Sequence, residues 1–371
     1  MKKVGVIGGG QLARMMIPAA INLGLEIRVF SETEGSPAAL AVTQVGDYRS
    51  TTEVAAFARH VQVLTFDHEH VPTQVLKEIQ TLGLIVSPSP EALALTQNKI
   101  VMRTKLAELG IAQPRWSVAE AEAGAKNDNA LAVMGGFPCV AKKPSGGYDG
   151  KGVRVIDSWV EIEDWLAEGP VLLEEKVPFA RELALLSARR AGGEWVPWAP
   201  VETRQVDGVC SEVIAPAPGF EPASRDEADA LSRRIAEGVD IVGVLAVEVF
   251  QLPDDSLLVN ELAMRPHNSG HVFTELSVTS QFEQHLRAVA DLPLGSTSLI
   301  SPCGVMVNVF GGIDADSRER AWTAVSEAKI HDYAKSRRSG RKVGHVVVVG
   351  DSVEIALSRA ETARSIIISS R

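Results

Sequence analysis

The sequence predicts an α/β protein that begins with an open parallel β-sheet. The first observation is a buried strand at Val4–Ile7, an apolar helix at about Leu12–Leu23 and a second strand at Glu26–Phe30, which together form a βαβ unit. The second is the continuation of this alternation, with strands at Val63–Phe66 and Leu84–Val86. The third is the composition, because 45% hydrophobic and 23% charged residues are ordinary for a folded globular chain.

Length and charge limit what the protein does. A chain of 371 residues is long enough for two or three domains. Its net charge of -10 argues against a general nucleic-acid binder, and no apolar run approaches the roughly 20 residues of a membrane span. The cysteines Cys139, Cys210 and Cys303 are far apart, which is typical of a reducing compartment. We therefore expect a soluble, cytoplasmic protein with no nucleic-acid or membrane partner.

The first glycine turn has the spacing of a dinucleotide fingerprint. Gly8-x-Gly10-x-x-Ala13 follows the first strand, and Glu32 stands about 20 residues further on, where a ribose-binding acid is expected. Alone, this pattern favours a nicotinamide-dependent oxidoreductase. The same turn also serves any phosphate at the N-terminus of a helix, so the fingerprint is a weak signal.

Polar residues follow the strand at Val63–Phe66, at the sheet edge where open α/β proteins bind ligands. His68, Glu69 and His70 alternate there. Two histidines around an acid are compatible with zinc, but no third ligand follows with the spacing of a metal site.

A long helix is expected from Glu91 to Leu109 and carries Lys99. A new module begins at Pro114 and continues through a helix from Ala119 to Met134. A lone lysine on a helix is usually solvated, so Lys99 gains meaning only from its surroundings.

The stretch from Val140 to Val153 contains the most informative loop. Lys142 lies on a strand, and four glycines follow between Gly146 and Gly152. Such a loop has few Cβ atoms, so its amides can turn toward an anion, and Lys151 adds positive charge. We interpret it as a lid over nucleotide phosphates. The alternative is a flexible basic turn.

A β-hairpin carries two acids that face each other. If Val244–Phe250 and Leu257–Ala263 pair around a turn centred between Asp254 and Asp255, Glu248 lies directly opposite Glu261. Like charges in that position destabilise a sheet, and a hard divalent cation such as magnesium removes the repulsion. The alternative is that the pair splays apart or is neutralised by Lys and Arg.

Two further segments carry anion-binding residue types. Arg265–His271 has the composition of a rigid loop rich in hydrogen-bond donors, so His267 and His271 are not a helical zinc pair, and an anion or nucleotide pocket is the better interpretation. Near the end, five of the residues from Lys335 to Lys342 are basic. This turn is either a phosphate site or a solvated basic loop.

These motifs together resemble the 5-(carboxyamino)imidazole ribonucleotide synthases of purine biosynthesis, a family of ATP-grasp enzymes. The resemblance spans nearly the whole chain and rests on Gly-Gly-Tyr-Asp-Gly-Lys-Gly in the lid and on Arg-Pro-His-Asn-Ser-Gly-His after the hairpin. It implies an ATP-grasp fold with a Rossmann-like N-terminal domain at 1–95, an ATP-grasp region at 96–290 with a lid at about 113–178, and a small C-terminal domain at 291–371.

The resemblance also implies a reaction and a set of partners. ATP and bicarbonate would form carboxyphosphate, which carboxylates 5-aminoimidazole ribonucleotide and leaves ADP and phosphate. Magnesium, or manganese in its place, would be the metal, and the protein would be a homodimer. The rival readings are a purine-pathway ATP-grasp ligase acting on a glycinamide ribonucleotide, a nicotinamide oxidoreductase and a nucleotide-binding regulator without turnover.

The resemblance assigns site residues position by position. The catalytic set is Lys142, Tyr148, Asp149, Lys151, Arg265 and His267. The ATP set is Lys99, Lys142, Gly147, Gly150, Glu174, Glu175, Val177, Glu182 and Asn260, and the metal ligands are Glu248 and Glu261. The ribonucleotide set is Gln11, Glu69, Tyr148, Asp149, Arg265, His267, Asn268, Ser269, Lys335, Arg341 and Lys342.

The chain departs from the family pattern at a few positions. The family usually has Pro where Met264 stands, Gly where Ala334 stands, and other residues where His68 and His70 stand. Many other ATP-grasp enzymes place an Asn at the position of Ala263, so only two protein ligands to the metal are expected.

Overall fold

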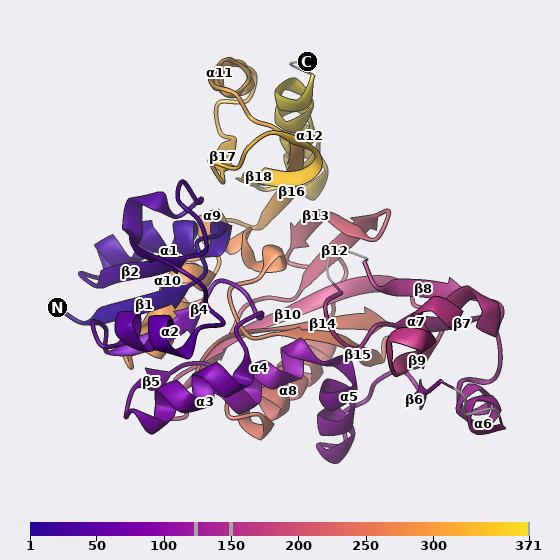
Figure 1. Ribbon diagram of the computed structural model, residues 1–371. Helices are drawn as coiled ribbons and strands as arrows, with labels where there is room; N and C mark the ends of the chain where they lie inside the picture. Colours follow the sequence, from indigo (N-terminus) through magenta and orange to yellow (C-terminus); the bar gives the residue numbers. More distant parts are fainter. Residues whose placement is uncertain (122–124, 148–150, 370–371) are drawn as a thin grey trace.

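The computed structural model describes residues 1–121, 125–147 and 151–369. The described residues form three β-sheets: a five-stranded sheet, a nine-stranded sheet and a four-stranded sheet. In Figure 1 the N-terminal sheet lies on the left, the four-stranded sheet on the right, and the C-terminal segment above the central sheet that joins them.

The N-terminal sheet is parallel and has the strand order β3-β2-β1-β4-β5. This confirms the predicted open parallel sheet, and it brings the carboxyl ends of β1, β2 and β4 to one edge. The elements are β1 (Lys3–Ile7), α1 (Gln11–Asn22), β2 (Glu26–Ser31), β3 (Val42–Val45), α2 (Thr51–Ala58), β4 (Val63–Phe66), α3 (Thr73–Thr81) and β5 (Ile85–Val86).

The single helix predicted from Glu91 to Leu109 is wrong, because two helices occupy this segment: α4 (Pro90–Gln97) and α5 (Lys99–Glu108). Asn98 between them has an extended backbone, and its side chain accepts hydrogen bonds from the backbone N–H groups of Ile100 and Val101. An Asn N-cap of this kind starts a new helix. Lys99 therefore stands at the first position of α5.

The four-stranded sheet is antiparallel, in the order β6-β9-β7-β8. The predicted helix from Ala119 is wrong at its start, because Trp116–Ala119 pairs with β9 as a strand. Val140 lies opposite Glu174 and Lys142 opposite Leu172, so Lys142 and Glu174 are diagonal neighbours. The elements are β6 (Trp116–Ala119), α6 (Ala125–Met134), β7 (Cys139–Lys142), β8 (Val153–Ile156), η2 (Trp159–Ile162), α7 (Glu163–Glu168) and β9 (Val171–Glu175).

The C-terminal strands extend the central sheet, whose order is β15-β14-β10-β12-β13-β16-β18-β17 with β11 beside β10. The link is the antiparallel pairing of β13 with β16. The strands are β10 (Arg181–Arg189), β11 (Trp195–Pro197), β12 (Val201–Val206), β13 (Val209–Ala215), β14 (Gly243–Gln251), β15 (Leu257–Ala263), β16 (Cys303–Gly311), β17 (Lys329–Asp332) and β18 (Arg338–Gly350). The helices are α8 (Pro222–Gly238), η3 (Asn268–Gly270), α9 (Phe273–Leu276), α10 (Gln281–Val289), α11 (Ala315–Ala324) and α12 (Val353–Ile368).

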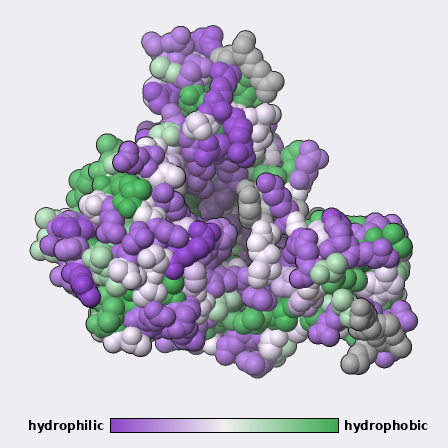
Figure 2. All heavy atoms as spheres, viewed as in Figure 1, coloured by the Kyte–Doolittle hydropathy of each residue, from purple (hydrophilic) through white to green (hydrophobic). Residues whose placement is uncertain are grey.

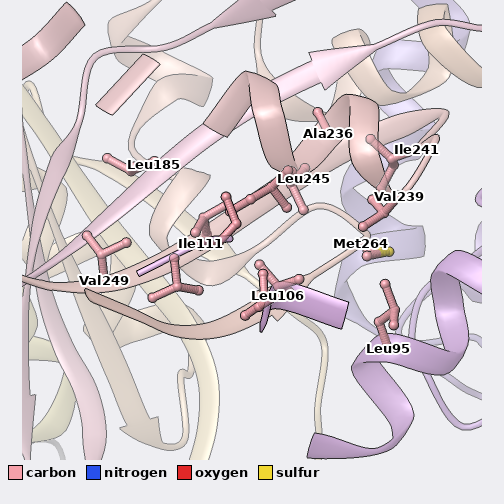
Figure 3. Packing of buried hydrophobic residues seen from close by; sticks show 14 of the residues in the cluster. Leu95, Leu106, Ile111, Leu185, Ala236, Val239, Ile241, Leu245, Val249 and Met264 are labelled. Carbon is pink, nitrogen blue, oxygen red and sulfur yellow. The ribbon is translucent and has the colours of Figure 1, made fainter. Parts of the chain in front are cut away.

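A hydrophobic core lies between the central sheet and the helices α4, α5 and α8 (Figure 3). Leu106 of α5 and Leu245 of β14 are both fully buried in it. Met264, where the family that the sequence resembles usually has Pro, is also in this cluster and is 1% exposed. The departure at Met264 is therefore accommodated by packing, and the same core fixes α5 against the sheet.

The outer surface carries a hollow, lined mainly by hydrophilic residues, below the C-terminal segment and between the N-terminal and four-stranded sheets (Figure 2). Among the described residues, no helix is long and apolar enough to cross a membrane.

Ala334 stands where the family that the sequence resembles usually has Gly, and its backbone is strained. Its φ is +54°, in the left-handed region that favours glycine, and it precedes the basic turn. We expect Ala334→Gly to raise the free energy of unfolding by about 1 kcal/mol. Glycine enters this region without a Cβ clash, and this gain exceeds the entropy cost of its greater freedom in the unfolded chain. Ala334→Val should destabilise the protein. Urea unfolding of the three proteins checks this, and equal midpoints would contradict it.

Candidate active site

The hairpin of β14 and β15 carries the two opposed acids. Glu248 lies directly opposite Glu261, which confirms the predicted pairing. Beyond this pair the register shifts by one residue, because Asn260 is an extra residue on β15. The predicted turn centre is wrong for the same reason: Leu252 N–H donates to Ser256 O, so the turn is centred on Asp254 itself.

The surroundings of Glu248 disfavour its ionised form. Desolvation raises the pKa of Glu248 to about 7, and the charges of Glu261 and Glu182 act in the same direction. Lys99 and Lys142 oppose the rise without cancelling it. Because 31% of the Glu248 side chain is exposed, a cation from solution can reach it. Two facing carboxylates that repel each other are a donor set that suits a hard divalent cation.

Glu261 is paired with a lysine, as the alternative prediction for the hairpin describes, because Lys99 Nζ forms an ion pair and a hydrogen bond with its carboxylate. The Lys99 backbone N–H also donates to Pro144 O at 2.8 Å, next to the strand that carries Lys142. The Asn98 cap and this contact together bring two of the predicted phosphate-binding lysines to one place.

Lys142 is held from two sides. Its Nζ lies 2.7 Å from Glu174 Oε2 and donates to Asn260 Oδ1 at 3.0 Å. Burial lowers the pKa of Lys142, although the carboxylate of Glu174 opposes that effect. Burial acts to raise the pKa of Glu174, but Lys142 and Arg103 outweigh it and keep the carboxyl ionised. Arg103 is a residue that sequence analysis missed.

The other predicted nucleotide residues differ in what they contact. Glu182 lies on β10 beside β14, and burial raises its pKa. The Glu175 carboxylate accepts from Arg115 Nε at 2.7 Å, so its observed partner is part of the four-stranded sheet region.

Sequence analysis missed Phe250, which stacks on Phe179 with ring centroids 4.6 Å apart. The available signal was spacing, since Phe250 follows Glu248 by two residues and shares its face of the strand.

A second group of predicted residues gathers around Arg265. Its guanidinium donates to Glu69 through Nε at 2.7 Å, which joins the loop after β15 to the edge of the N-terminal sheet. Burial acts to raise the pKa of Glu69, but Arg265 outweighs it and lowers the pKa to about 2. His267 Nε2 lies 3.5 Å from Glu248 Oε1, and burial followed by the charge of Arg265 lowers its pKa to about 3. His267 thus connects the two groups as a neutral imidazole.

Hydrogen bonds hold the loop itself, which contains the short η3 turn. Gln281 of α10 accepts from His267 N–H and donates to His267 O, both at 2.8 Å. His267 Nδ1 and Ser269 Oγ are 2.8 Å apart, and Asn268 begins η3. These contacts fix the orientation of the loop.

The basic turn reaches the same region. The charge of Lys342 contributes to the lowered pKa of His267, after burial and Arg265. Arg341 is hydrogen-bonded to Ser336 Oγ at 2.6 Å, and Lys335 lies over the Tyr333 ring. Arg14 of α1 donates to Asp332 O at 3.1 Å, so the helix that begins with Gln11 is linked to this turn.

The first glycine turn is filled by the chain's own acids. Asp67 accepts from Leu12 N–H at 3.1 Å, and a Cβ at Gly10 would collide with its carboxylate. Glu32, the expected ribose-binding acid, lies 2.7 Å from His68 Nε2. The position where a dinucleotide pyrophosphate would bind is therefore occupied by Asp67. This argues against a nicotinamide enzyme.

The histidines after β4 do not form a zinc site. The Nε2 of His68 is taken by Glu32, and its Nδ1 accepts from the backbone N–H of His70 at 3.2 Å. In the described part of the chain, no group of three or more His, Cys, Asp or Glu is arranged to hold a metal ion.

The glycine loop is described only in part. A Cβ at Gly147 would lie 2.6 Å from Lys151 O, so the loop ends approach too closely for any other residue at position 147. Tyr148, Asp149 and Gly150 lie outside the described residues.

Comparison with known proteins decides the family. Residues 1–97 match the ribonucleotide synthetase preATP-grasp domain, residues 104–282 the ATP-grasp domain, and residues 304–359 the phosphoribosylaminoimidazole carboxylase C-terminal domain. An N5-carboxyaminoimidazole ribonucleotide synthase from Mycobacterium bovis is 43% identical over 97% of this chain and 86% of its own length. One from Corynebacterium ammoniagenes is 42% identical, over 99% of this chain and 92% of its own.

The chain belongs to the N5-carboxyaminoimidazole ribonucleotide synthase family. It is an ATP-dependent ligase of purine biosynthesis. The synthetase from Thermus thermophilus is 33% identical, with a TM-score of 0.88 over 99% of both chains. The synthase from Aspergillus clavatus, solved in complex with ADP and 5-aminoimidazole ribonucleotide, is 30% identical with the same TM-score and coverage. The synthase fold therefore includes the C-terminal extension of the central sheet.

The raised pKa of Glu248 predicts a pH-dependent effect of Glu248→Gln in the absence of metal and nucleotide. The pKa of Glu248 in the folded protein lies above the usual 4.5. Its contribution to the free energy of unfolding is therefore fully present below about pH 4.5 and is lost as the pH rises through about 7. Relative to the wild type, Glu248→Gln should gain about 1–2 kcal/mol of stability between pH 5 and pH 8, a value reduced for partial exposure. Urea unfolding at both pH values measures this. A difference that does not change with pH would contradict it.

Proposed function

We propose that this synthase carboxylates 5-aminoimidazole ribonucleotide with bicarbonate at the expense of ATP, at a site made of the two groups of residues described above. The observation that carries the proposal is the contact between His267 and Glu248, at 3.5 Å, which joins the lysine- and carboxylate-rich group to the Arg265–Glu69 group. A reaction that moves a phosphoryl group to bicarbonate and then carbon to an amine needs both binding regions side by side.

The first group is assigned to ATP. Of the three donors of the Lys142 ammonium, two are directed at Glu174 and Asn260, which leaves one for a phosphate oxygen. Lys99 adds a second positive charge, and the glycine loop covers the phosphates. We assign the adenine to the segment at Val177, beside the Phe179–Phe250 pair, and the ribose to Glu182.

Glu248 and Glu261 are assigned to magnesium, for which manganese can substitute. Their mutual repulsion and the raised pKa of Glu248 support a bound cation, and the remaining ligands would be phosphate oxygens and water. When bound, the metal would neutralise charge on the phosphates during transfer. Lys99 keeps Glu261 oriented before the cation arrives.

The second group is assigned to the ribonucleotide and to carboxyphosphate. Arg265 is fixed by Glu69, so its remaining donors are oriented before an anion binds. His267 is assigned to contact the exocyclic amine as a neutral imidazole; because its pKa is lowered to about 3, the phosphate that leaves carboxyphosphate would take the proton as the carbon–nitrogen bond forms. Closure of the glycine loop, with Tyr148, Asp149 and Lys151, would exclude the water that hydrolyses carboxyphosphate. Gln11, Asn268, Ser269 and the turn with Lys335, Arg341 and Lys342 complete the pocket for the ribonucleotide.

Two further assignments rest on the family. We propose a homodimer, as the resemblance implies, and a cytoplasmic location. Three free cysteines, of which Cys139 and Cys303 are buried, support a reducing compartment.

The reaction predicts a strict substrate dependence. Phosphate release from ATP should require bicarbonate and 5-aminoimidazole ribonucleotide together, because positioning of both is needed before the lid closes productively. A coupled phosphate assay with each substrate omitted in turn measures this, and mass spectrometry identifies the product. Turnover with glycinamide ribonucleotide in place of the aminoimidazole would favour the rival ligase. Binding of both nucleotides without turnover would favour a regulator.

The basic turn should hold the 5′-phosphate of the ribonucleotide. Arg341→Ala should therefore raise the Kd for the ribonucleotide by roughly tenfold or more, as expected for a charge-assisted hydrogen bond, and leave the Kd for ADP unchanged. Calorimetric titration with each ligand checks this, and Arg338→Ala at the same turn is a matched control for the loss of charge. An equal loss of ADP binding would make the turn a nucleotide or structural element.

A further inference from the structure

Arg103 is a fully buried arginine. Two of the residues that it contacts, Glu174 and Asn260, also contact Lys142. Arg103 lies on α5, four residues after Lys99, and its side chain is 0% exposed. Arginine is almost never fully buried without a dedicated set of partners. Met102 and Leu106 on the same helix are in the hydrophobic core, so the backbone around Arg103 is held in place.

The guanidinium uses its whole donor fork. Nε donates to Glu174 Oε1 at 2.8 Å, and Nη2 lies 2.8 Å from the same oxygen. Nη1 donates to Val259 O at 2.7 Å and to Gln113 Oε1 at 3.4 Å, and Nη2 donates to Asn260 O at 2.8 Å. Each of the three guanidinium nitrogens therefore donates to at least one acceptor.

Two of these acceptors are consecutive carbonyls of one strand. In a regular strand, successive carbonyl groups point to opposite sides, so one guanidinium would not reach both. The bulge at Asn260 allows Val259 O and Asn260 O to face Arg103 together. The same bulge presents the Asn260 side chain to Lys142 and sets the residue after it, Glu261, opposite Glu248.

The contacts close into a ring. Arg103 binds Glu174, Glu174 binds Lys142, Lys142 binds the Asn260 side chain, and the Asn260 carbonyl accepts from Arg103. The four members come from α5, β9, β7 and β15, so the ring ties the four-stranded sheet to the central sheet at the position proposed for the nucleotide phosphates.

We propose that Arg103 is a positioning residue for ATP: it holds Glu174 and the Asn260 bulge so that Lys142 presents its remaining donor to the phosphates. The resemblance places Glu174 at the adenine edge, whereas this proposal has Glu174 act through Lys142 and not through the adenine. The inference rests on the proposed role of Lys142. A lysine at position 103 keeps the charge but lacks the planar fork that reaches several acceptors at once.

The test compares ligands with and without phosphates. In Arg103→Lys, the Kd for ADP should rise by at least about tenfold, while the Kd for adenosine, which has no phosphate, should stay within about twofold. Competition against a fluorescent nucleotide gives both values. Arg189→Lys is the matched control, because Arg189 also binds one carboxylate and one carbonyl, Asp240 and Ile241 O, outside the ring. It should leave both Kd values unchanged.

Glu174→Gln separates the two roles of that residue and provides a second variant if Arg103→Lys does not fold. The proposal predicts weaker ADP binding with unchanged adenosine binding, and the double variant should lose no more ADP affinity than the worse single variant. Weaker adenosine binding in Glu174→Gln, additive losses, or normal ADP binding in folded Arg103→Lys would each overturn it. Lys142→Ala distinguishes two kinds of failure. If this variant binds ADP normally, both the proposed role of Lys142 and the inference about Arg103 are wrong. If this variant loses ADP affinity while Arg103→Lys and Glu174→Gln keep it, only the inference about Arg103 is wrong.

Discussion

The pairing of Glu248 with Glu261 is the constraint on which the rest of the site depends. Two carboxylates directly opposite each other on one face of a hairpin repel, and desolvation adds to the cost of charging Glu248. A positive charge close to the pair offsets part of this cost. Two neighbouring groups limit this cost: Lys99 binds one member, and the neutral His267 lies beside the other.

The positive charges of the site come from distant parts of the chain. The Asn98 cap places Lys99 at the start of α5, and the four-stranded sheet brings Lys142 on β7 next to Glu174 on β9. Arg103 then joins these groups to the bulged strand that carries Glu261. On the other side, Arg265 connects the loop after β15 to Glu69 at the edge of the N-terminal sheet. The candidate active site therefore lies where residues from three sheets meet.

Local patterns in the sequence are sufficient for the parallel sheet and the facing glutamates, because each depends on residues close together in the chain. Arg103 could not be predicted, since a single arginine on a helix is usually solvated and its acceptors come from other elements. The bulge at Asn260 is also invisible to strand periodicity, and it is stabilised by that same arginine. The joining of β13 to β16 and the occupation of the glycine turn by Asp67 depend on long-range packing. The site residues were assigned through the family resemblance, and their roles remain predictions.

We propose that the Glu248–Glu261 pair binds a cation together with the nucleotide. The number of protons released when magnesium and ADP bind at pH 7 tests this most directly, and calorimetry in two buffers of different ionisation enthalpy measures it. A glutamate with a pKa of about 7 is half protonated there, so we expect about half a proton to be released per site in the wild type, and none from this position in Glu248→Gln. Equal proton release by the wild type and the variant would contradict the account.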